Sequence, residues 1–266
     1  MVFLLGIFYF TFGAIAGSFL NVVVLRYNTG LSIRGRSACL SCGEKLSWFE
    51  LIPLLSFFLY RGRCRTCGSS ISPQYPLVEA LTGLLYVSIF LKQLSVPYTF
   101  YMLIIASLLV AILVYDMRHK IIPNGLVYAF ILLALFSTVV EPGTLQVHIP
   151  AFSVLASGPL LFLPFYFLWF VSSGAWMGLG DGKLALGIGW FFGIAGGLSA
   201  IMFAFWIGAA VSVFLLALSY IRTRYQLSGT RKVFTIKSEM PFAPFLILGF
   251  FIVFFFDIDI ISLITL

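Results

Sequence analysis

Long apolar runs alternate with short polar segments along this chain. The runs lie near residues 3–25, 76–94, 98–115, 125–140, 151–171, 184–197, 199–221 and 242–264. Most have a length of about 20 residues, which an α-helix needs to cross a bilayer, whereas a spanning β-strand needs about 10. The pattern therefore predicts an all-α polytopic membrane protein with about eight transmembrane helices. The run 184–197 is short and rich in glycine, so its separation from 199–221 is the least regular feature of the pattern.

The composition agrees with membrane helices and excludes an ordinary soluble domain. Of the 266 residues, 61% are hydrophobic and 9% are charged, whereas soluble globular domains have about 25% charged residues. The net charge of +7 would also suit a protein that binds nucleic acid, but basic residues in a membrane protein mark its orientation. We therefore expect membrane lipid, and not nucleic acid, around this chain.

The basic residues predict that orientation. None precedes the first run, and the first is Arg26, so the run 3–25 is expected to be a retained helix and not a cleaved signal peptide. If the N-terminus lies outside, 15 of the 16 basic residues fall in loops on the inner side, with Lys92 as the exception. Because positive charge marks the cytoplasmic side, these inner loops are predicted to be cytoplasmic. Asp116 and Asp181 then lie at the cytoplasmic ends of their helices.

The segment 26–75 differs in composition from the rest of the chain. It holds seven basic residues and all four cysteines. Its apolar stretch Leu51–Tyr60 has only ten residues, too few to span a bilayer, so it is expected to form a small core or to lie at the membrane interface. The chain is thus divided into a first transmembrane helix (1–25), a cytoplasmic loop domain (26–75) and a transmembrane domain (76–266).

The cysteines form two matched pairs, each followed by a glycine, Gly43 or Gly68. The pairs are separated by 21 residues and consist of Cys39, Cys42, Cys64 and Cys67. Doubled Cys-x-x-Cys turns are typical of a tetrahedral zinc site. The alternatives are two disulfides, which a cytoplasmic location disfavours, or four unligated thiols. A site with four thiolates has no open position for a substrate, so the zinc is predicted to be structural and to stabilise the small loop domain.

Asp181 lies between glycines in an otherwise apolar region, in the stretch Gly178-Leu179-Gly180-Asp181-Gly182-Lys183-Leu184. An ionisable residue in a membrane segment indicates a functional site. Gly178 and Gly180 have no Cβ, so the backbone can bend there and a substrate backbone can approach, while Lys183 adds positive charge nearby. The alternative is that Asp181 only caps a helix that starts at Lys183.

A second carboxylate, Asp116, ends the run 98–115 just before a basic turn. Taken alone, it fits an interface residue paired with Arg118 or Lys120. Taken with Asp181, it is a carboxylate on another helix at the same predicted membrane depth. Two carboxylates that share one proton can activate water against a peptide carbonyl. The sequence therefore indicates an acid–base pair of Asp116 and Asp181.

Two polar residues, Ser18 and Asn21, interrupt the first apolar run. Polar side chains in membrane helices commonly make contacts between helices. We expect these two to contact another helix or, alternatively, to line a site.

Taken together, several motifs make the chain resemble the bacterial prepilin peptidases, or type IV leader peptidases, of the Gly-x-Gly-Asp group of intramembrane aspartyl proteases. The resemblance covers most of the chain. Besides the cysteine pairs, it rests on Gly17-Ser18-Phe19-Leu20-Asn21-Val22, Ile52-Pro53-Leu54-Leu55-Ser56, Tyr75-Pro76-Leu77-Val78-Glu79, Asp116 with Ile122-Pro123-Asn124, the stretch 178–184, and Pro241-Phe242-Ala243-Pro244-Phe245. Two positions depart from the family pattern: Ala243 replaces the usual Gly, and Tyr115 stands where Ile is common.

The resemblance implies that Asp116 and Asp181 are the catalytic pair, located in the bacterial inner membrane with the active site facing the cytoplasm. It implies that the substrates are precursors of type IV pilins and type II secretion pseudopilins, whose basic leader is cut after a glycine. It also implies N-methylation of the new N-terminal residue with S-adenosylmethionine, an activity tied to the cysteine-bearing loop. The chain has no Gly-rich fingerprint of the dinucleotide-binding kind, so no residues are assigned to the methyl donor.

Two other functions are compatible with the composition. A proton-coupled transporter would use the two aspartates as a relay, but it would be expected to have broken helices at related positions in two halves. A non-enzymatic scaffold would use the zinc loop to dock a partner and would tolerate loss of either aspartate. The sequence assigns neither an oligomeric state nor a particular pilin.

Overall fold

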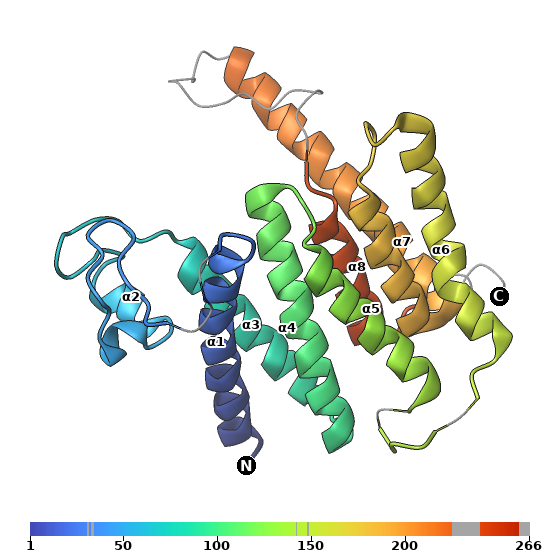
Figure 1. Ribbon diagram of the computed structural model, residues 1–266, viewed down its shortest axis with the longest axis horizontal. Helices are drawn as coiled ribbons and strands as arrows, with labels where there is room; N and C mark the ends of the chain where they lie inside the picture. The colour runs from blue at the N-terminus through green and yellow to red at the C-terminus, as the bar shows by residue number, and fades with distance from the viewer. Residues whose placement is uncertain (31, 33–34, 142, 148, 225–239, 261–266) are drawn as a thin grey trace. The chain divides into compact units, whose positions relative to one another are not determined.

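The structure is a computed structural model that describes residues 1–266 except 31, 33–34, 142, 148, 225–239 and 261–266. Regular structure in the described residues is helical, apart from three isolated β-bridges. The long helices are α1 (Val2–Arg26), α3 (Gln74–Leu91), α4 (Val96–His119), α5 (Asn124–Val139), α6 (Phe152–Ser172), α7 (Leu179–Arg224) and α8 (Ala243–Phe256) (Figure 1). Two short helices, η1 (Trp48–Leu51) and α2 (Leu55–Leu59), lie between α1 and α3.

Five helices of the described chain are long and apolar enough to cross a membrane: α1, α3, α4, α6 and α7. The apolar helices α5 and α8 are shorter. The expected all-helical membrane architecture is therefore confirmed, while a total of eight spans stays a prediction. The basic residues Arg34, Arg231, Lys232 and Lys237, which the predicted orientation uses, lie outside the described residues.

The two runs predicted at 184–197 and 199–221 belong to one helix, α7, that is interrupted at Gly193. This residue has φ 75° and ψ −172°, a conformation outside the helical region that is essentially restricted to glycine. The prediction of two helical segments was therefore correct, but the interruption between them lies at Gly193, earlier than predicted. Gly197 remains helical and packs closely on α6, since an added Cβ would collide with Leu161.

The last helix ends earlier than its apolar run. The run was predicted to continue to residue 264; α8 ends at Phe256, and residues 261–264 of the prediction lie outside the described residues. Asp257 then adopts the left-handed conformation with φ 50°, and its backbone N–H donates to the carbonyl of Val253. A left-handed residue closes the helix and satisfies one of its last carbonyl groups.

The chain folds into two compact units. Unit 1 comprises Met1–Val114 and Glu141–Gln146, and unit 2 comprises Tyr115–Val140 and Val147–Leu266. The division falls within α4. The functional division proposed above, into 1–25, 26–75 and 76–266, is a different one and stays a prediction.

In unit 1, α1 packs along α3 through glycines. A Cβ on Gly13 would lie 2.7 Å from the carbonyl oxygen of Thr82, and one on Gly17 would lie 2.8 Å from Cα of Glu79. Small residues allow membrane helices to approach this closely. The contact predicted for Asn21 is present, because its Nδ2 donates to the carbonyl oxygen of Tyr75 at 3.2 Å.

In unit 2, α7 is the central helix and packs against α5, α6 and α8 (Figure 1). Glycines again permit the close crossings: Gly187 lies against Phe130 of α5, and Gly249 of α8 lies against the backbone of Ala200. Ser157 of α6 donates a hydrogen bond to the carbonyl oxygen of Gly189 at 2.8 Å. These contacts hold the start of α7 against its neighbours, which matters for the site described next.

The apolar stretch Leu51–Tyr60 does not form a buried core. Its helix α2 exposes Leu55, Phe58 and Leu59, whose side chains are 60%, 71% and 75% accessible. Of the two alternatives, the small core is therefore not what the structure shows, and a position at the membrane interface stays a prediction.

Candidate active site and metal site

Asp116 lies in the last turn of α4 and is almost completely buried. Its side chain is 4% exposed, whereas Arg118 and Lys120 are exposed. The carboxyl interacts with the backbone N–H of Ala243, the first residue of α8. Its Oδ2 atom is buried without a hydrogen-bond partner among the described residues. A buried oxygen with free lone pairs is available for a proton or for a reacting group.

Asp181 lies in the first turn of α7 and is also buried, with 9% of its side chain exposed. The expectation that a helix starts at Lys183 is wrong, because α7 begins at Leu179 and Asp181 is its third residue. The physical reason is local. The Asp181 backbone N–H donates to the carbonyl oxygen of Gly178 at 3.2 Å, and its carboxyl interacts with the Gly178 backbone. An acidic residue at this third position commonly reaches back in this way to the start of its helix.

The fold brings the two carboxyls together within unit 2. They come from the C-terminal end of α4 and the N-terminal end of α7, and they lie close enough for their charges to interact. Two residues that are 65 positions apart in the chain are thus buried next to each other. Two carboxyls in this relation tend to bind one proton between them, because two buried negative charges repel each other.

The glycines around Asp181 are explained by packing. A Cβ on Gly180 would lie 2.8 Å from Cβ of Ile122, in the loop that follows Asp116. A Cβ on Gly182 would lie 3.0 Å from Cβ of Phe165 on α6. At Gly178 the nearest atom would be Oδ2 of Asp181 itself, at 3.7 Å, which is an ordinary contact. Gly180 therefore sets the distance between the two aspartate-bearing segments.

Lys183 ties the same two segments together. Its Nζ donates a hydrogen bond to Oδ1 of Asn124 at 2.8 Å, and it lies 4.9 Å from the centre of the Tyr128 ring. Asn124 is the first residue of α5 and follows the Asp116 loop. The charge of Lys183 is thus used in a contact between α7 and α5, two residues beyond Asp181.

Sequence reasoning did not assign roles to Ile122, Asn124 or Ala243, although all three belong to motifs that carried the resemblance. In the structure, Ile122 packs on Gly180, Asn124 accepts from Lys183, and Ala243 presents its backbone N–H to Asp116. The departure from the family pattern at Ala243 leaves this backbone donor in place. The signal in the sequence was the motifs themselves, but only the fold shows what they contact.

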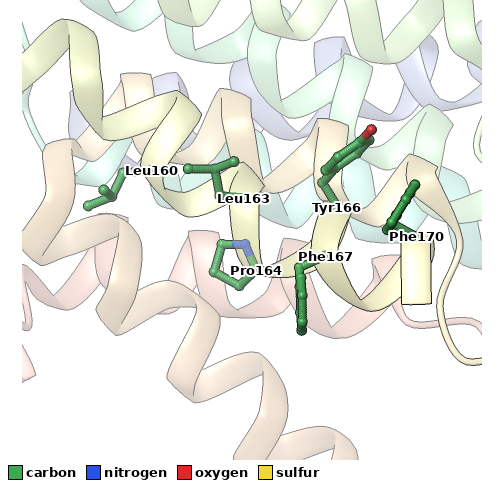
Figure 2. Close-up of a pocket in the computed structure, with 6 residues that line it drawn as sticks. All are labelled: Leu160, Leu163, Pro164, Tyr166, Phe167 and Phe170. Carbon is green, nitrogen blue, oxygen red and sulfur yellow. The ribbon is translucent and has the colours of Figure 1, made fainter. Parts of the chain in front are cut away.

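An apolar groove lies on α6 (Figure 2). It is lined by Leu160, Leu163, Pro164, Tyr166, Phe167 and Phe170. Figure 2 shows these side chains all coming from the one helix. A surface of this kind on a membrane helix suits lipid tails and offers no acid, base or nucleophile besides the Tyr166 hydroxyl.

The four cysteines lie together in unit 1. Their sulfur atoms are all within 4.8 Å of one another, and the Sγ atoms of Cys39 and Cys67 are 3.8 Å apart. Zinc–sulfur bonds of about 2.3 Å in a tetrahedron require sulfur–sulfur distances of about 3.8 Å. The donor set and its spacing therefore fit a tetrahedral metal ion of the zinc type.

Both cysteine pairs are held by the same turn. Gly43 and Gly68 have φ of +74° and +70°, and their N–H groups donate to the carbonyl oxygens of Cys39 and Cys64, each at 2.9 Å. Glycine adopts this left-handed conformation without strain. The backbone N–H groups of Cys42 and Ser41 lower the pKa of the Cys39 thiol to about 6. Metal ions bind the thiolate form, so the lowered pKa of Cys39 favours ligation by that residue.

Comparison with known proteins gives a consistent result. Residues 11–93 match the bacterial peptidase A24 N-terminal domain, and residues 103–221 match the type IV leader peptidase family. A prepilin leader peptidase/N-methyltransferase of Myxococcus xanthus is 37% identical over 216 residues, which cover 80% of this chain and 64% of the relative. One of Xanthomonas campestris pv. campestris is 28% identical over 279 residues, covering 94% and 91%.

A third relative is described as a type 4 prepilin-like proteins leader peptide-processing enzyme, from Escherichia coli O78:H11. It is 30% identical over 196 residues, which cover 66% of this chain and 70% of the relative. No solved structure matches the chain.

Proposed function

The chain belongs to the type IV leader peptidase family, and we propose from this premise that it cleaves the basic leader from prepilins and N-methylates the new N-terminus. The curated relatives carry both activities in their names. Family membership also favours this function over a proton-coupled transporter or a zinc-loop scaffold. Pseudopilin precursors of type II secretion are proposed as further substrates.

The observation that carries the peptidase proposal is the buried pair of Asp116 and Asp181. Both side chains are less than a tenth exposed, and they lie within electrostatic reach of each other. The backbone of Ala243 holds the Asp116 carboxyl, and the backbone of Gly178 holds the Asp181 carboxyl. This arrangement suits an aspartic peptidase, which needs one ionised and one protonated carboxyl side by side.

The chemistry that the pair supports is hydrolysis of a peptide bond. The ionised carboxyl takes a proton from a water molecule as the water oxygen bonds to the carbonyl carbon, while the protonated carboxyl donates its proton to the carbonyl oxygen. The tetrahedral intermediate then breaks at its carbon–nitrogen bond: the leaving nitrogen takes a proton from the protonated carboxyl, while a hydroxyl of the intermediate gives its proton to the ionised carboxyl as the carbonyl re-forms. Gly180 and Lys183 contribute indirectly, by holding the Asp181 turn against the loop after Asp116.

The cysteine cluster is proposed to hold one structural zinc ion. Four thiolates complete a tetrahedron and leave no position for substrate. Cys39, Cys42, Cys64 and Cys67 hold the ion, which ties together the two ends of a loop with little buried core of its own. Its role toward methylation is to keep this loop folded.

The proposed setting is the bacterial inner membrane, with the N-terminus outside and the carboxyl pair at the cytoplasmic face. The support is the distribution of basic residues, 15 of which fall in the predicted inner loops. This side is where a basic leader would remain before cleavage. S-adenosylmethionine, the co-substrate that provides an electrophilic methyl group, is also a cytoplasmic compound.

Incubation with a synthetic precursor tests both activities at once. The purified protein in lipid vesicles should convert a prepilin peptide to a product without the leader, and with S-adenosylmethionine the product should gain the mass of one methyl group. A precursor whose glycine before the cut is replaced by a bulky residue serves as the control. An intact precursor after incubation with the folded protein would contradict the proposal.

A further inference from the structure

Three motifs that the proposed active site does not use converge within unit 1. They are the Gly17–Asn21 part of α1, the Ile52–Ser56 stretch of the loop, and the Tyr75–Glu79 start of α3. Asn21 and Tyr75 are in contact, and Glu79 reaches Leu54. Residues that are distant along the chain thus build a second buried polar cluster, which lacks any role so far.

The centre of this cluster is the carboxyl of Glu79, which is 7% exposed. Its Oε2 accepts a hydrogen bond from the backbone N–H of Leu54 at 2.8 Å, and the Ser18 side chain also interacts with it. Among the residues that the structure describes, no cationic side chain is paired with Glu79. A carboxylate buried in a membrane protein without a cation is costly and indicates a functional site.

Leu54, the donor to Glu79, has a strained backbone. Its φ of 62° and ψ of −54° are rare for a residue with a side chain, and the N–H of Leu55 donates to the carbonyl oxygen of Pro53 at 2.6 Å. This is a γ-turn with positive φ, which persists only where its surroundings hold it. The Glu79 carboxyl is one of the groups that hold it. Because Leu54 lies between the two cysteine pairs, Glu79 connects α3 with the loop that holds the cysteines.

Asn21 adds a buried acceptor that has no donor among the described residues. Its side chain is 1% exposed, and its Nδ2 donates to Tyr75. Its Oδ1 is buried and has no hydrogen-bond partner among the described residues. A carboxylate has about four lone-pair positions, and only Leu54 and Ser18 are identified as partners of Glu79. The cluster therefore has more acceptors than donors, which suits a ligand that brings several N–H groups and a positive charge.

We propose that Asn21 and Glu79 bind the free amino group of the processed substrate and that Glu79 accepts its proton before methyl transfer. This inference rests on the proposed function. A primary ammonium has three N–H donors and one charge, which match the unpartnered Oδ1 and the carboxylate. By the orientation predicted from the basic residues, the C-terminal end of α1 and the N-terminal end of α3 face the cytoplasm, as does the N-terminus that cleavage leaves.

The proton and electron balance is simple. One N–H bond of the ammonium breaks, and its proton goes to Glu79, so the nitrogen regains its lone pair. That pair forms the bond to the methyl carbon of S-adenosylmethionine, while the carbon–sulfur bond breaks and its electrons stay on sulfur. The product is a methylated ammonium, and S-adenosylhomocysteine leaves uncharged at sulfur. Glu79 returns its proton to solvent.

The variant Glu79→Gln separates this role from a purely structural one. Glutamine keeps a carbonyl oxygen that can accept from Leu54, but it carries no charge and takes no proton. Methylation per cleaved substrate molecule should fall at least tenfold, measured by mass analysis of the same reaction. Glu50→Gln, in helix η1 of the same unit and bound to Ser47, is the matched control and should leave the ratio unchanged. A wild-type ratio in Glu79→Gln would overturn the proposal.

A second measurement uses the unaltered protein and does not depend on activity. Dicyclohexylcarbodiimide labels carboxyls in apolar surroundings, and mass analysis resolves Glu79 from Asp116 and Asp181. An already cleaved pilin peptide with a free amino terminus should protect Glu79 at least fivefold better than its N-acetylated form. Equal protection by the two peptides would overturn the proposal. If the wild-type protein cleaves but never methylates while the free amine still protects Glu79, the proposed methylation fails and the binding site stands.

Discussion

The metal site of unit 1 and the carboxyl pair of unit 2 are built in opposite ways. Each cysteine pair is closed by its own turn, with a left-handed glycine and backbone hydrogen bonds between residues at most nine positions apart. Asp116 and Asp181 are 65 residues apart and meet only because α4, α7 and α8 converge. The first site depends on local backbone geometry, and the second depends on helix packing.

The difference has consequences for how each site fails. A change within a cysteine turn removes a ligand but leaves the packing of the long helices intact. A change at a helix crossing near Asp181 leaves every catalytic group present but moves it. Reactive groups displaced by about 1 Å can lose about 100-fold in rate. The following experiments use this contrast.

Replacement of either carboxyl should have the largest effect on cleavage. Asp116→Asn and Asp181→Asn are nearly isosteric, but the amide neither accepts a proton from water nor donates one to the carbonyl. General acid–base catalysis contributes about 100- to 10,000-fold, so leader cleavage should fall at least 100-fold. The measurement is the rate of product formation from a synthetic precursor.

The matched control is Asp257→Asn, because Asp257 lies in the same unit at the end of α8 and has φ 50°, which asparagine tolerates well. It should cleave within about twofold of the wild-type rate, because Asp257 is exposed and surface substitutions away from a site usually have small effects. Near wild-type cleavage by Asp116→Asn or Asp181→Asn would show that the pair is not catalytic.

Loss of a metal ligand should separate the two activities. Cys39→Ser removes one of four thiolates, so the bound zinc, expected at one ion per chain, should be lost. Methylation should fall at least tenfold and cleavage much less, because the carboxyl pair is built without the cysteine loop. Elemental analysis and the mass assay measure the two effects. Thr66→Ala, in a cysteine turn but not a ligand, is the control, and stoichiometric metal in a Cys39→Ser/Cys64→Ser double variant would refute the site.

The sequence predicted the local site better than the dispersed one. Two Cys-x-x-Cys-Gly turns determine their own backbone, so the ligand set followed from spacing, and the sulfur atoms do lie together. The helical class followed from the length of the apolar runs. The aspartates were found because charge is rare in such runs, and the structure brings them together. Their catalytic role remains a prediction.

What the sequence did not predict depends on packing. The start of α7 was predicted at Lys183 but lies at Leu179, because capping depends on which backbone group the Asp181 carboxyl reaches. Hydropathy also did not show which of the neighbouring glycines interrupts the helix, because the pattern of apolar residues carries no information on the backbone conformation of Gly193. Ala243 contacts Asp116, which is 127 residues away in the chain, and no local sequence pattern predicts a contact over that distance.

A smaller loss of cleavage is expected when the packing of unit 2 is disturbed without removal of a catalytic group. In Gly180→Ala the new Cβ would lie 2.8 Å from Cβ of Ile122, so the Asp181 turn must move. We expect about a 10- to 100-fold loss in kcat with little change in KM. Gly178→Ala, whose Cβ would make only ordinary contacts, 3.7 Å from Oδ2 of Asp181 and 3.9 Å from the Gly180 nitrogen, should lose clearly less. Equal losses would mean that the glycines serve substrate access and not helix spacing.

The smallest effect should come from the link between Lys183 and Asn124. Lys183→Met and Asn124→Ala each remove the same 2.8 Å hydrogen bond, which is worth about 1 kcal/mol at a partly exposed position. Each should lower kcat/KM by about fivefold, and the double variant should lose little more than either single one, because the contact is already gone. Tyr128→Leu, which removes only the ring beside Lys183, should lose less. If the losses of the two single variants multiplied in the double variant, Lys183 would act on something other than Asn124, and the leader or the peptide carbonyl would be the next partner to test.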